Sequence, residues 1–220
     1  MNKELVQQRR YWDNEVNGFD AIYSHRKSRV SNWLDAKFRW DMYARFDYTM
    51  NQSEPIKGRS FLDVGCGTGG YSLEFLRRGA QRVVGRDISG RMIAVCQERA
   101  KAEHQEARYR FIVSDLLQYE PDTLFDICIG IGLFDYIREP QIVLSKMRKV
   151  VRDKAIMTFP RFWTWRAPVR KMRLALCGCA AFFYTKERID VLLRRAGFNH
   201  YRMDQVGQLY CVTASVRIQE

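Results

Sequence analysis

The sequence predicts an α/β fold built on a mostly parallel, doubly wound β-sheet. Beyond about residue 58, short apolar runs of strand length alternate with longer segments of helical length. A glycine-rich turn joins the first of these strands to its helix, and acidic residues follow several strands. Because ligands of such sheets bind outside the carboxyl ends of the strands, we expect the functional site at that edge.

Residues 1–57 precede this alternation and interleave aromatic side chains with Arg and Lys. The spacing of Trp33, Trp40 and Ala44 suits an amphipathic helix. We therefore predict an N-terminal helical lid over residues 1–57, followed by a ligand-binding domain over residues 58–220. For any single aromatic residue, packing against the core is the alternative interpretation.

The first predicted strand, residues 61–64, runs into four glycines within the next six residues. Glycine permits a sharp turn and lets a ligand approach the backbone, while the first N–H groups of the next helix, residues 71–78, are available as donors. Gly65, Gly67 and Gly70 also match the dinucleotide fingerprint G-x-G-x-x-G of dehydrogenases, and a purely structural turn would need glycines too. The turn alone leaves its ligand open.

The second predicted strand, residues 82–87, ends in an acid. Asp87 lies 22 positions after Gly65. A carboxylate at about this spacing can reach the hydroxyls of a ribose, because its two oxygens accept hydrogen bonds from a vicinal diol. Ser89 then suits the N-cap of a helix that runs to residue 102.

The alternation of strands and helices continues to the C-terminus. The remaining predicted elements are strands over 109–113, 126–131, 154–159, 201–206 and 208–217, and helices over 140–151 and 185–196. The last two strands are predicted to form an antiparallel pair at the sheet edge. We expect four acidic side chains at the carboxyl edge of the sheet: Asp63, Asp87, Asp115 and Asp135.

The chain is strongly basic, with a net charge of +12. Such a charge favours an anionic partner, which would be a nucleic acid, a membrane surface or an acidic substrate, although solubility alone is an equal explanation. Residues 161–173 carry five cations and no acid, interleaved with aromatic side chains. We predict an insertion over residues 161–184 that contacts an anionic ligand or a membrane surface, or covers the mouth of the site; a solvated insertion is the alternative.

No apolar run is long enough for a membrane span and the N-terminus is polar, so we expect a cytoplasmic protein. The six cysteines include no C-x-x-C pair, which argues against a zinc site. No metal site is predicted.

Three features of the sequence occur together: the run Asp63-Val64-Gly65-Cys66-Gly67-Thr68-Gly69, the acids Asp87 and Asp115 after the next two strands, and a closing pair of strands. Together they resemble a class I S-adenosylmethionine-dependent methyltransferase over about residues 58–218. The resemblance implies a Rossmann-like seven-stranded, mostly parallel sheet with an antiparallel C-terminal strand. It also implies S-adenosylmethionine as the cofactor and makes a dehydrogenase the weaker reading.

The resemblance assigns roles to residues along the predicted edge. Asp63 and the glycines would hold the methionine part of the cofactor, Asp87 the ribose hydroxyls, and residues 114–116 would frame the adenine. The cofactor-binding residues implied in this way are Asp63, Gly65, Cys66, Gly67, Gly69, Asp87, Ile88, Ser114, Asp115, Leu116, Gly130 and Ile131.

Within this family the chain is similar to small-molecule O-methyltransferases of the ubiquinone-biosynthesis and magnesium-protoporphyrin kind. The similarity rests on Phe134-Asp135-Tyr136, on the insertion after the fifth strand and on the helix closed by residues 196–198. It implies direct in-line methylation of an oxygen or nitrogen atom, with an anionic, lipid-like or tetrapyrrole acceptor. Asp135 stands where the porphyrin enzymes tend to have His, which leaves the acceptor and the base open.

The candidate catalytic residues are Asp135, Tyr136 and His25. A phenol or amine acceptor would benefit from such a base, whereas a carboxylate acceptor would need none. Two other functions stay open. The charge favours an RNA methyltransferase, but the chain lacks both the Asp/Asn-Pro-Pro-aromatic run and a Pro-Cys pair. A cofactor-binding scaffold without activity is the third reading.

Overall fold

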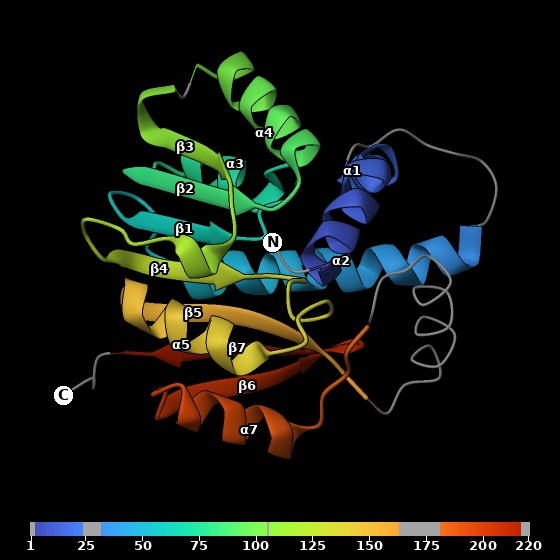
Figure 1. Ribbon diagram of the computed structural model, residues 1–220, viewed down its shortest axis with the longest axis vertical. Coiled ribbons are helices and arrows are strands. Elements are labelled where there is room, and N and C mark those ends of the chain that lie inside the picture. The colour runs from blue at the N-terminus through green and yellow to red at the C-terminus, as the bar shows by residue number, and fades with distance from the viewer. Residues whose placement is uncertain (1–2, 24–31, 105, 163–180, 217–220) are drawn as a thin grey trace.

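The computed structural model describes residues 3–23, 32–104, 106–162 and 181–216. Its centre is a seven-stranded sheet with the order β3-β2-β1-β4-β5-β7-β6 (Figure 1). The strands are β1 (Ser60–Val64), β2 (Arg82–Asp87), β3 (Tyr109–Val113), β4 (Phe125–Gly130), β5 (Val151–Pro160), β6 (His200–Val206) and β7 (Leu209–Ser215). The predicted α/β fold with a mostly parallel sheet is confirmed.

The strand directions follow the predicted pattern. Strands β1 to β5 pair in parallel, whereas β7 is antiparallel to both β5 and β6. The closing hairpin lies at the sheet edge as expected, but its second strand lies inside and its first strand, β6, outside. Burial explains the order, because residues 209–212 of β7 are all buried while β6 has none that are fully buried.

The helices occupy both faces of the sheet. They are α1 (Lys3–Tyr23), α2 (Asn32–Ser53), α3 (Gly70–Arg77), α4 (Gly90–Ala102), α5 (Pro140–Val150) and α7 (Lys186–Arg195), with short 3-10 turns η1 (Glu106–Arg108) and η2 (Leu116–Gln118). Ser89 accepts a hydrogen bond from the N–H of Met92, and Thr185 accepts one from the N–H of Arg188. The predicted N-cap of α4 is therefore confirmed, and α7 begins with a similar cap.

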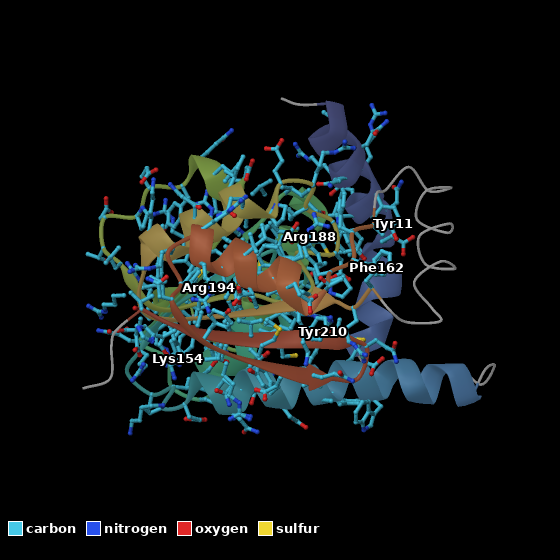
Figure 2. All side chains as sticks on the ribbon, turned by 90° about the horizontal axis from the view of Figure 1, so that it is seen from below. Tyr11, Lys154, Phe162, Arg188, Arg194 and Tyr210 are labelled. Atoms are coloured by element: carbon cyan, nitrogen blue, oxygen red, sulfur yellow. The ribbon has the colours of Figure 1, made fainter. Side chains whose placement is uncertain are left out.

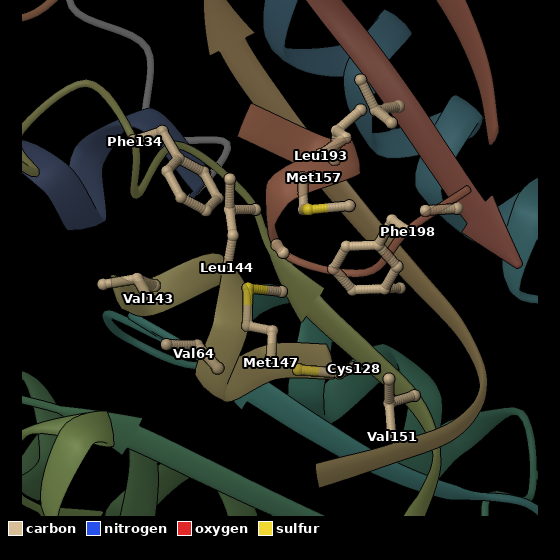
Figure 3. Packing of buried hydrophobic residues seen from close by; sticks show 14 of the residues in the cluster. Val64, Cys128, Phe134, Val143, Leu144, Met147, Val151, Met157, Leu193 and Phe198 are labelled. Atoms are coloured by element: carbon tan, nitrogen blue, oxygen red, sulfur yellow. The ribbon is translucent and has the colours of Figure 1, made fainter. Parts of the chain in front are cut away.

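Two apolar layers sandwich the sheet, because alternate strand residues face opposite sides. In β4, Cys128 joins the layer formed with α5 and α7, whereas Ile127 and Ile129 join the layer formed with α2, α3 and α4. Figure 3 shows the first layer, in which Leu144 and Met147 of α5 pack beside Phe198. Packing on both faces fixes the strand ends, and thereby the loops that follow them.

The N-terminal segment is helical, as predicted. Helix α2 contacts β5, β6 and β7, while α1 contacts α4. Figure 1 shows α1 at the end of the sheet toward which the β4 arrow points, which is the carboxyl edge of the parallel strands. The N-terminal helices are thus placed beside the edge where the sequence locates the site.

The described ranges contain neither a membrane-spanning helix nor a cluster of metal-ligating side chains. None of the helices there has the length and apolar character needed to cross a membrane. Nor does that part of the chain bring together three or more His, Cys, Asp or Glu side chains in a group that could hold a metal ion.

Candidate functional site

The glycine turn after β1 is tied to the end of β2. The N–H groups of Gly65 and Cys66 both donate to the carbonyl of Arg86, at 2.8 and 3.1 Å. Gly65, Gly67 and Gly69 have φ values of +73°, +54° and +84°, a region that residues with a side chain rarely adopt. At Gly69 a Cβ atom would also lie 2.3 Å from the Sγ of Cys96. Glycine is therefore required to close this turn.

Asp87 lies at the carboxyl end of β2 and faces the glycine turn. Its Oδ2 accepts a hydrogen bond from the N–H of Gly67 at 3.0 Å, and its Oδ1 accepts one from the N–H of Ser89 at 2.9 Å. Burial raises the pKa of Asp87, and these backbone donors oppose the rise. A carboxylate offers about four acceptor positions, so two bonds leave capacity for a diol.

Asp63 lies beneath the same turn and is almost completely buried, at 2% exposure. Its Oδ2 accepts a hydrogen bond from the hydroxyl of Ser72 at 2.7 Å. Burial and, to a smaller extent, the charge of Asp87 raise the pKa of Asp63 to about 7, while the hydrogen bond from Ser72 opposes the rise. A buried carboxylate of this kind is stabilised by a nearby cation.

Thr68, within the glycine turn, carries an unsatisfied polar atom. Its hydroxyl is fully buried and makes no hydrogen bond with the described residues. Buried polar atoms without a partner are uncommon in folded proteins. The turn therefore combines an unpaired hydroxyl with two carboxylates, Asp63 and Asp87, which suits a polar ligand that carries positive charge.

Residues 114–116, predicted to frame an adenine, follow β3 directly beside Asp87. The N–H of Ser114 donates to the carbonyl of Asp87 at 2.9 Å, and the Oδ1 of Asp115 accepts from the N–H of Leu117 at 3.0 Å. The hydroxyl of Ser114 accepts from the guanidinium of Arg86. The segment is thus fixed in place by β2.

Arg86 is a charged residue in a buried strand, a feature of the sequence that predicted no role. Its guanidinium lies 3.9 Å from the ring centroid of Tyr119. Burial lowers the pKa of Arg86. Stacking on the aromatic face and the bond to Ser114 together allow the charged side chain of Arg86 to be buried in this place.

The turn after β4 forms the other side of the site. Gly130 and Ile131 are buried at the carboxyl end of β4, where the N–H of Gly132 donates to the hydroxyl of Thr158 at 2.8 Å. Asp135 is 4% exposed, and its carbonyl accepts from the N–H of Phe182 at 2.8 Å. The glycine turn after β1 and the turn after β4 thus lie at the same edge of the sheet.

Helix α1 joins these two sides of the site. The amide of Gln8 donates to the carbonyl of Tyr136 at 2.7 Å, and the ring of Trp12 meets the ring of Tyr136 edge-on, with centroids 4.9 Å apart. The residue after Trp12 is Asp13, whose carboxylate accepts a hydrogen bond from the hydroxyl of Ser89 at 2.5 Å. Tyr136 is therefore covered by α1.

No sequence pattern points to Gln8 or Asp13, because polar residues on a predicted helix are usually solvated. Trp12 belonged to a set of aromatic residues whose partners were unknown. His25, the third candidate catalytic residue, lies outside the described residues. The side chain of Leu116 is not described either, so only its place at the start of η2 is known.

Comparison with known proteins identifies the family of this site. Residues 61–154 match the family model of a methyltransferase domain, a range that contains the glycine turn, Asp87 and the β4 turn. Ubiquinone biosynthesis O-methyltransferase from Rhizobium rhizogenes is 31% identical over 105 residues, which are 48% of this chain and 42% of that protein. Residues 61–154 therefore form a methyltransferase domain of the class I S-adenosylmethionine-dependent kind. The predictions of this family and of S-adenosylmethionine as its cofactor are confirmed.

The relatives of this methyltransferase differ in what they act on. tRNA U34 carboxymethyltransferase from Haemophilus influenzae is 27% identical over 115 residues, covering 52% of this chain and 35% of that protein. The chain thus matches less than half the length of each of these two curated relatives. The acceptor cannot be transferred from either of them.

Solved structures confirm the fold of the methyltransferase over nearly its whole length. Magnesium protoporphyrin IX methyltransferase from Synechocystis has a TM-score of 0.77 at 21% identity, covering 97% of this chain and 99% of that one. Phosphoethanolamine N-methyltransferase 2 from Haemonchus contortus has a TM-score of 0.66 at 20% identity, covering 87% of this chain and 43% of that one. The cyclase SpnF also shares the fold, with a TM-score of 0.69 at 17% identity, 95% of each chain being covered. The fold alone therefore does not decide the reaction.

Proposed function

We propose that this protein is an enzyme that transfers the methyl group of S-adenosylmethionine directly to an oxygen or nitrogen atom of a small molecule. The observation that carries the proposal is a pair of carboxylates, the buried Asp63 and the partly exposed Asp87, beside a glycine turn within a methyltransferase domain. When bound, the cofactor supplies an electrophilic methyl group on a sulfonium.

The cofactor half of the site has three tasks in this proposal. Asp87 accepts hydrogen bonds from the ribose hydroxyls, and its own bonds to the N–H groups of Gly67 and Ser89 hold it in position. The glycine turn lets the ligand lie against the backbone. Asp63 provides a negative charge beneath the turn, which a cationic ligand would compensate.

The acceptor half orients the nucleophile and excludes water. Tyr136 is held by Gln8 and Trp12, so α1 closes the site on this side; we assign the lid function of residues 1–57 to this contact. Asp135 is the first candidate to accept a proton from a phenol or amine acceptor, and Tyr136 the second. In this proposal most of the rate enhancement comes from holding the nucleophilic atom of the acceptor in line with the methyl group of the cofactor.

RNA methylation is the second candidate function. Two observations favour it: the net charge of +12 and the similarity to the tRNA U34 carboxymethyltransferase. An RNA substrate would bind with an affinity that falls steeply as salt is raised, because phosphate contacts release counterions. A small-molecule acceptor is preferred because α1 narrows access to the β4 turn through Gln8 and Trp12.

Two measurements on the purified protein test the proposal. Calorimetric titration with S-adenosylmethionine, and with a nicotinamide dinucleotide as the comparison, should give binding of the first alone. Transfer of a radiolabelled methyl group is then measured with phenols, aromatic carboxylates and amines, and with bulk tRNA. Labelling of a small molecule supports the proposal, labelling of tRNA alone would replace it with the second candidate, and binding of the dinucleotide alone would refute both. Turnover by the protein alone would also exclude a scaffold without activity.

A further inference from the structure

Three cationic side chains gather around two tyrosines at the carboxyl edge of β5. Arg161 follows β5, and Lys186 and Arg188 lie in the first turn of α7. The guanidinium of Arg161 and the ammonium of Lys186 lie 5.6 and 5.9 Å from the ring centroid of Tyr210, and the guanidinium of Arg188 lies 5.0 Å from the ring centroid of Tyr184. We call Arg161, Lys186 and Arg188 the cation cluster.

Hydrogen bonds connect the cation cluster to the turn after β4. The hydroxyl of Tyr184 donates to the carbonyl of Phe134 at 3.1 Å, and the N–H of Phe182 donates to the carbonyl of Asp135 at 2.8 Å. Figure 2 shows Phe162, which follows Arg161, near Tyr11 of α1, and Arg188 closer to these two residues than Arg194 and Lys154 are. The cluster therefore lies beside the acceptor half of the site.

The three cations of the cluster are not held in ion pairs with acids among the described residues. None of its three members forms an ion pair there, whereas other cations of the surface do, for example Arg152 with Asp126. Glu187 is the neighbour of Lys186, and its pKa is lowered by the backbone donor at the start of its own helix, by the hydroxyl of Thr185 and, to a smaller extent, by the charge of Lys186.

The guanidinium of Arg161 is only partly satisfied by hydrogen bonds within the described part of the chain. One of its terminal nitrogens donates to the carbonyl of Gly207 at 3.0 Å, which fixes the guanidinium, while its Nε is buried and has no partner in the described part of the chain. On the adjoining helix α2, the carboxylate of Asp41 lies against Gly207.

We propose that the cation cluster binds an anionic group, a carboxylate or a phosphate, carried by the methyl acceptor. The inference rests on the proposed function, because the cluster is a subsite of the same acceptor half. Guanidinium groups donate two parallel hydrogen bonds to either anion, and the ammonium adds a point charge. The rings of Tyr184 and Tyr210 restrict where the cations lie, so the anion is held at a set distance from the β4 turn.

A matched pair of fluorescent probes tests the subsite without requiring turnover. 1-Pyrenebutyrate carries a carboxylate on an aromatic body, and 1-pyrenebutanol is its neutral counterpart. Their dissociation constants are measured by fluorescence with the full chain in the presence of S-adenosylhomocysteine. The wild-type protein should bind the acid at least about tenfold more tightly than the alcohol, because hydrogen bonds to charged groups are the stronger ones. Inorganic phosphate and acetate, added as competitors, show which anion the cluster prefers.

The variant Lys186→Gln/Arg188→Gln removes two exposed cations of the cluster. It should weaken binding of the acid by about tenfold or more and leave the alcohol unchanged. The control Lys149→Gln/Arg195→Gln removes two exposed cations elsewhere and changes the net charge equally; it should keep the preference for the acid. Equal affinity for the two probes in the wild-type protein, or equal losses in both variants, would overturn the inference.

The same samples separate this inference from the proposed function. If S-adenosylhomocysteine binds while the probes are not distinguished, the anion subsite is wrong and the methyltransferase function stands. If neither S-adenosylmethionine nor S-adenosylhomocysteine binds, the proposed function fails, whatever the cluster binds.

Discussion

The carboxyl edge of the sheet divides into two halves of opposite charge. The half formed by β1, β2 and β3 carries buried or half-buried acids: Asp63, Asp87 and Asp115, with Asp13 contributed by α1. The half formed by β5, β7 and α7 carries the cation cluster, whose three members form no ion pair with the described residues. The turn after β4 lies between them.

This separation explains how one edge can hold two different ligands. An acidic half suits a cationic cofactor with a ribose diol, and a basic half suits an anionic acceptor. A protein with a total charge of +12 would otherwise repel a cation from its surface. The local arrangement of charges therefore carries more information about function than the total.

The largest effect is expected at the boundary between the two halves. Replacing Asp135 with Asn removes a candidate base while keeping its size, so turnover with a phenol or amine acceptor should fall by about 10²- to 10⁴-fold. Affinity for S-adenosylmethionine, measured by calorimetry, should change little. Undiminished turnover would remove Asp135 as a base, and Tyr136→Phe would then be the variant to measure.

Substitution of Asp87 is the most direct test of cofactor binding by the acidic half. The Asp87→Ala variant loses the acceptors for the ribose hydroxyls, and S-adenosylmethionine should bind about 100-fold more weakly by calorimetry. Asp87→Asn keeps one acceptor oxygen and should lose less. Circular dichroism serves as the control for folding, because the N–H groups of Gly67 and Ser89 lose a partner in the Ala variant. Affinity equal to that of the wild-type protein would contradict this placement of the ribose.

Replacing Asp63 with Asn should change the stability of the fold and the affinity for S-adenosylmethionine in opposite directions. The pKa of Asp63 is raised to about 7 from the usual 3.8, so the folded protein binds this proton more tightly and loses stability as pH rises through that window. At pH 8 the Asp63→Asn variant without cofactor should be more stable, on the order of 4 kcal/mol, and near pH 4 the difference should become small. Denaturant titrations at both pH values measure this.

Asp63→Asn should also bind S-adenosylmethionine more weakly, because a negative charge beneath the glycine turn is lost. A variant that is less stable than the wild-type protein at pH 8, or that binds the cofactor equally well, would show that Asp63 serves the fold alone.

The smallest effect is expected at α1, which bridges the two halves. Trp12→Ala removes the ring that meets Tyr136, and KM for the acceptor should rise about tenfold, as expected for the loss of one aromatic contact and of water exclusion. Tyr43→Ala on α2, whose side chain is 53% exposed, is the matched control and should leave KM unchanged. Equal effects of the two changes would argue against a lid.

Local chemistry made much of the acidic half predictable from sequence. Strands β2 and β3 were predicted with their observed bounds, and the cap at Ser89 was recognised, because glycines, caps and apolar runs act over a few residues. Position in the sheet was harder to predict: β7 lies inside β6 because its apolar residues are buried between two neighbours, a choice made by tertiary packing.

Most of the basic half depends on contacts between distant residues. Arg161 was visible as part of a basic run, but its approach to Lys186 across the ring of Tyr210 depends on the pairing of β5 with β7. The contact of Gln8 with Tyr136 spans 128 positions. Neither could be derived from a local pattern.

A crystal structure with S-adenosylhomocysteine and 1-pyrenebutyrate would test the two-halves account most directly. We predict the ribose hydroxyls within about 2.6–3.2 Å of the carboxylate of Asp87, and the carboxylate of the probe against Lys186 and Arg188. The sulfur atom should face the turn that carries Asp135 and Tyr136. A ribose bound away from Asp87, or a probe carboxylate on the acidic half, would contradict the account.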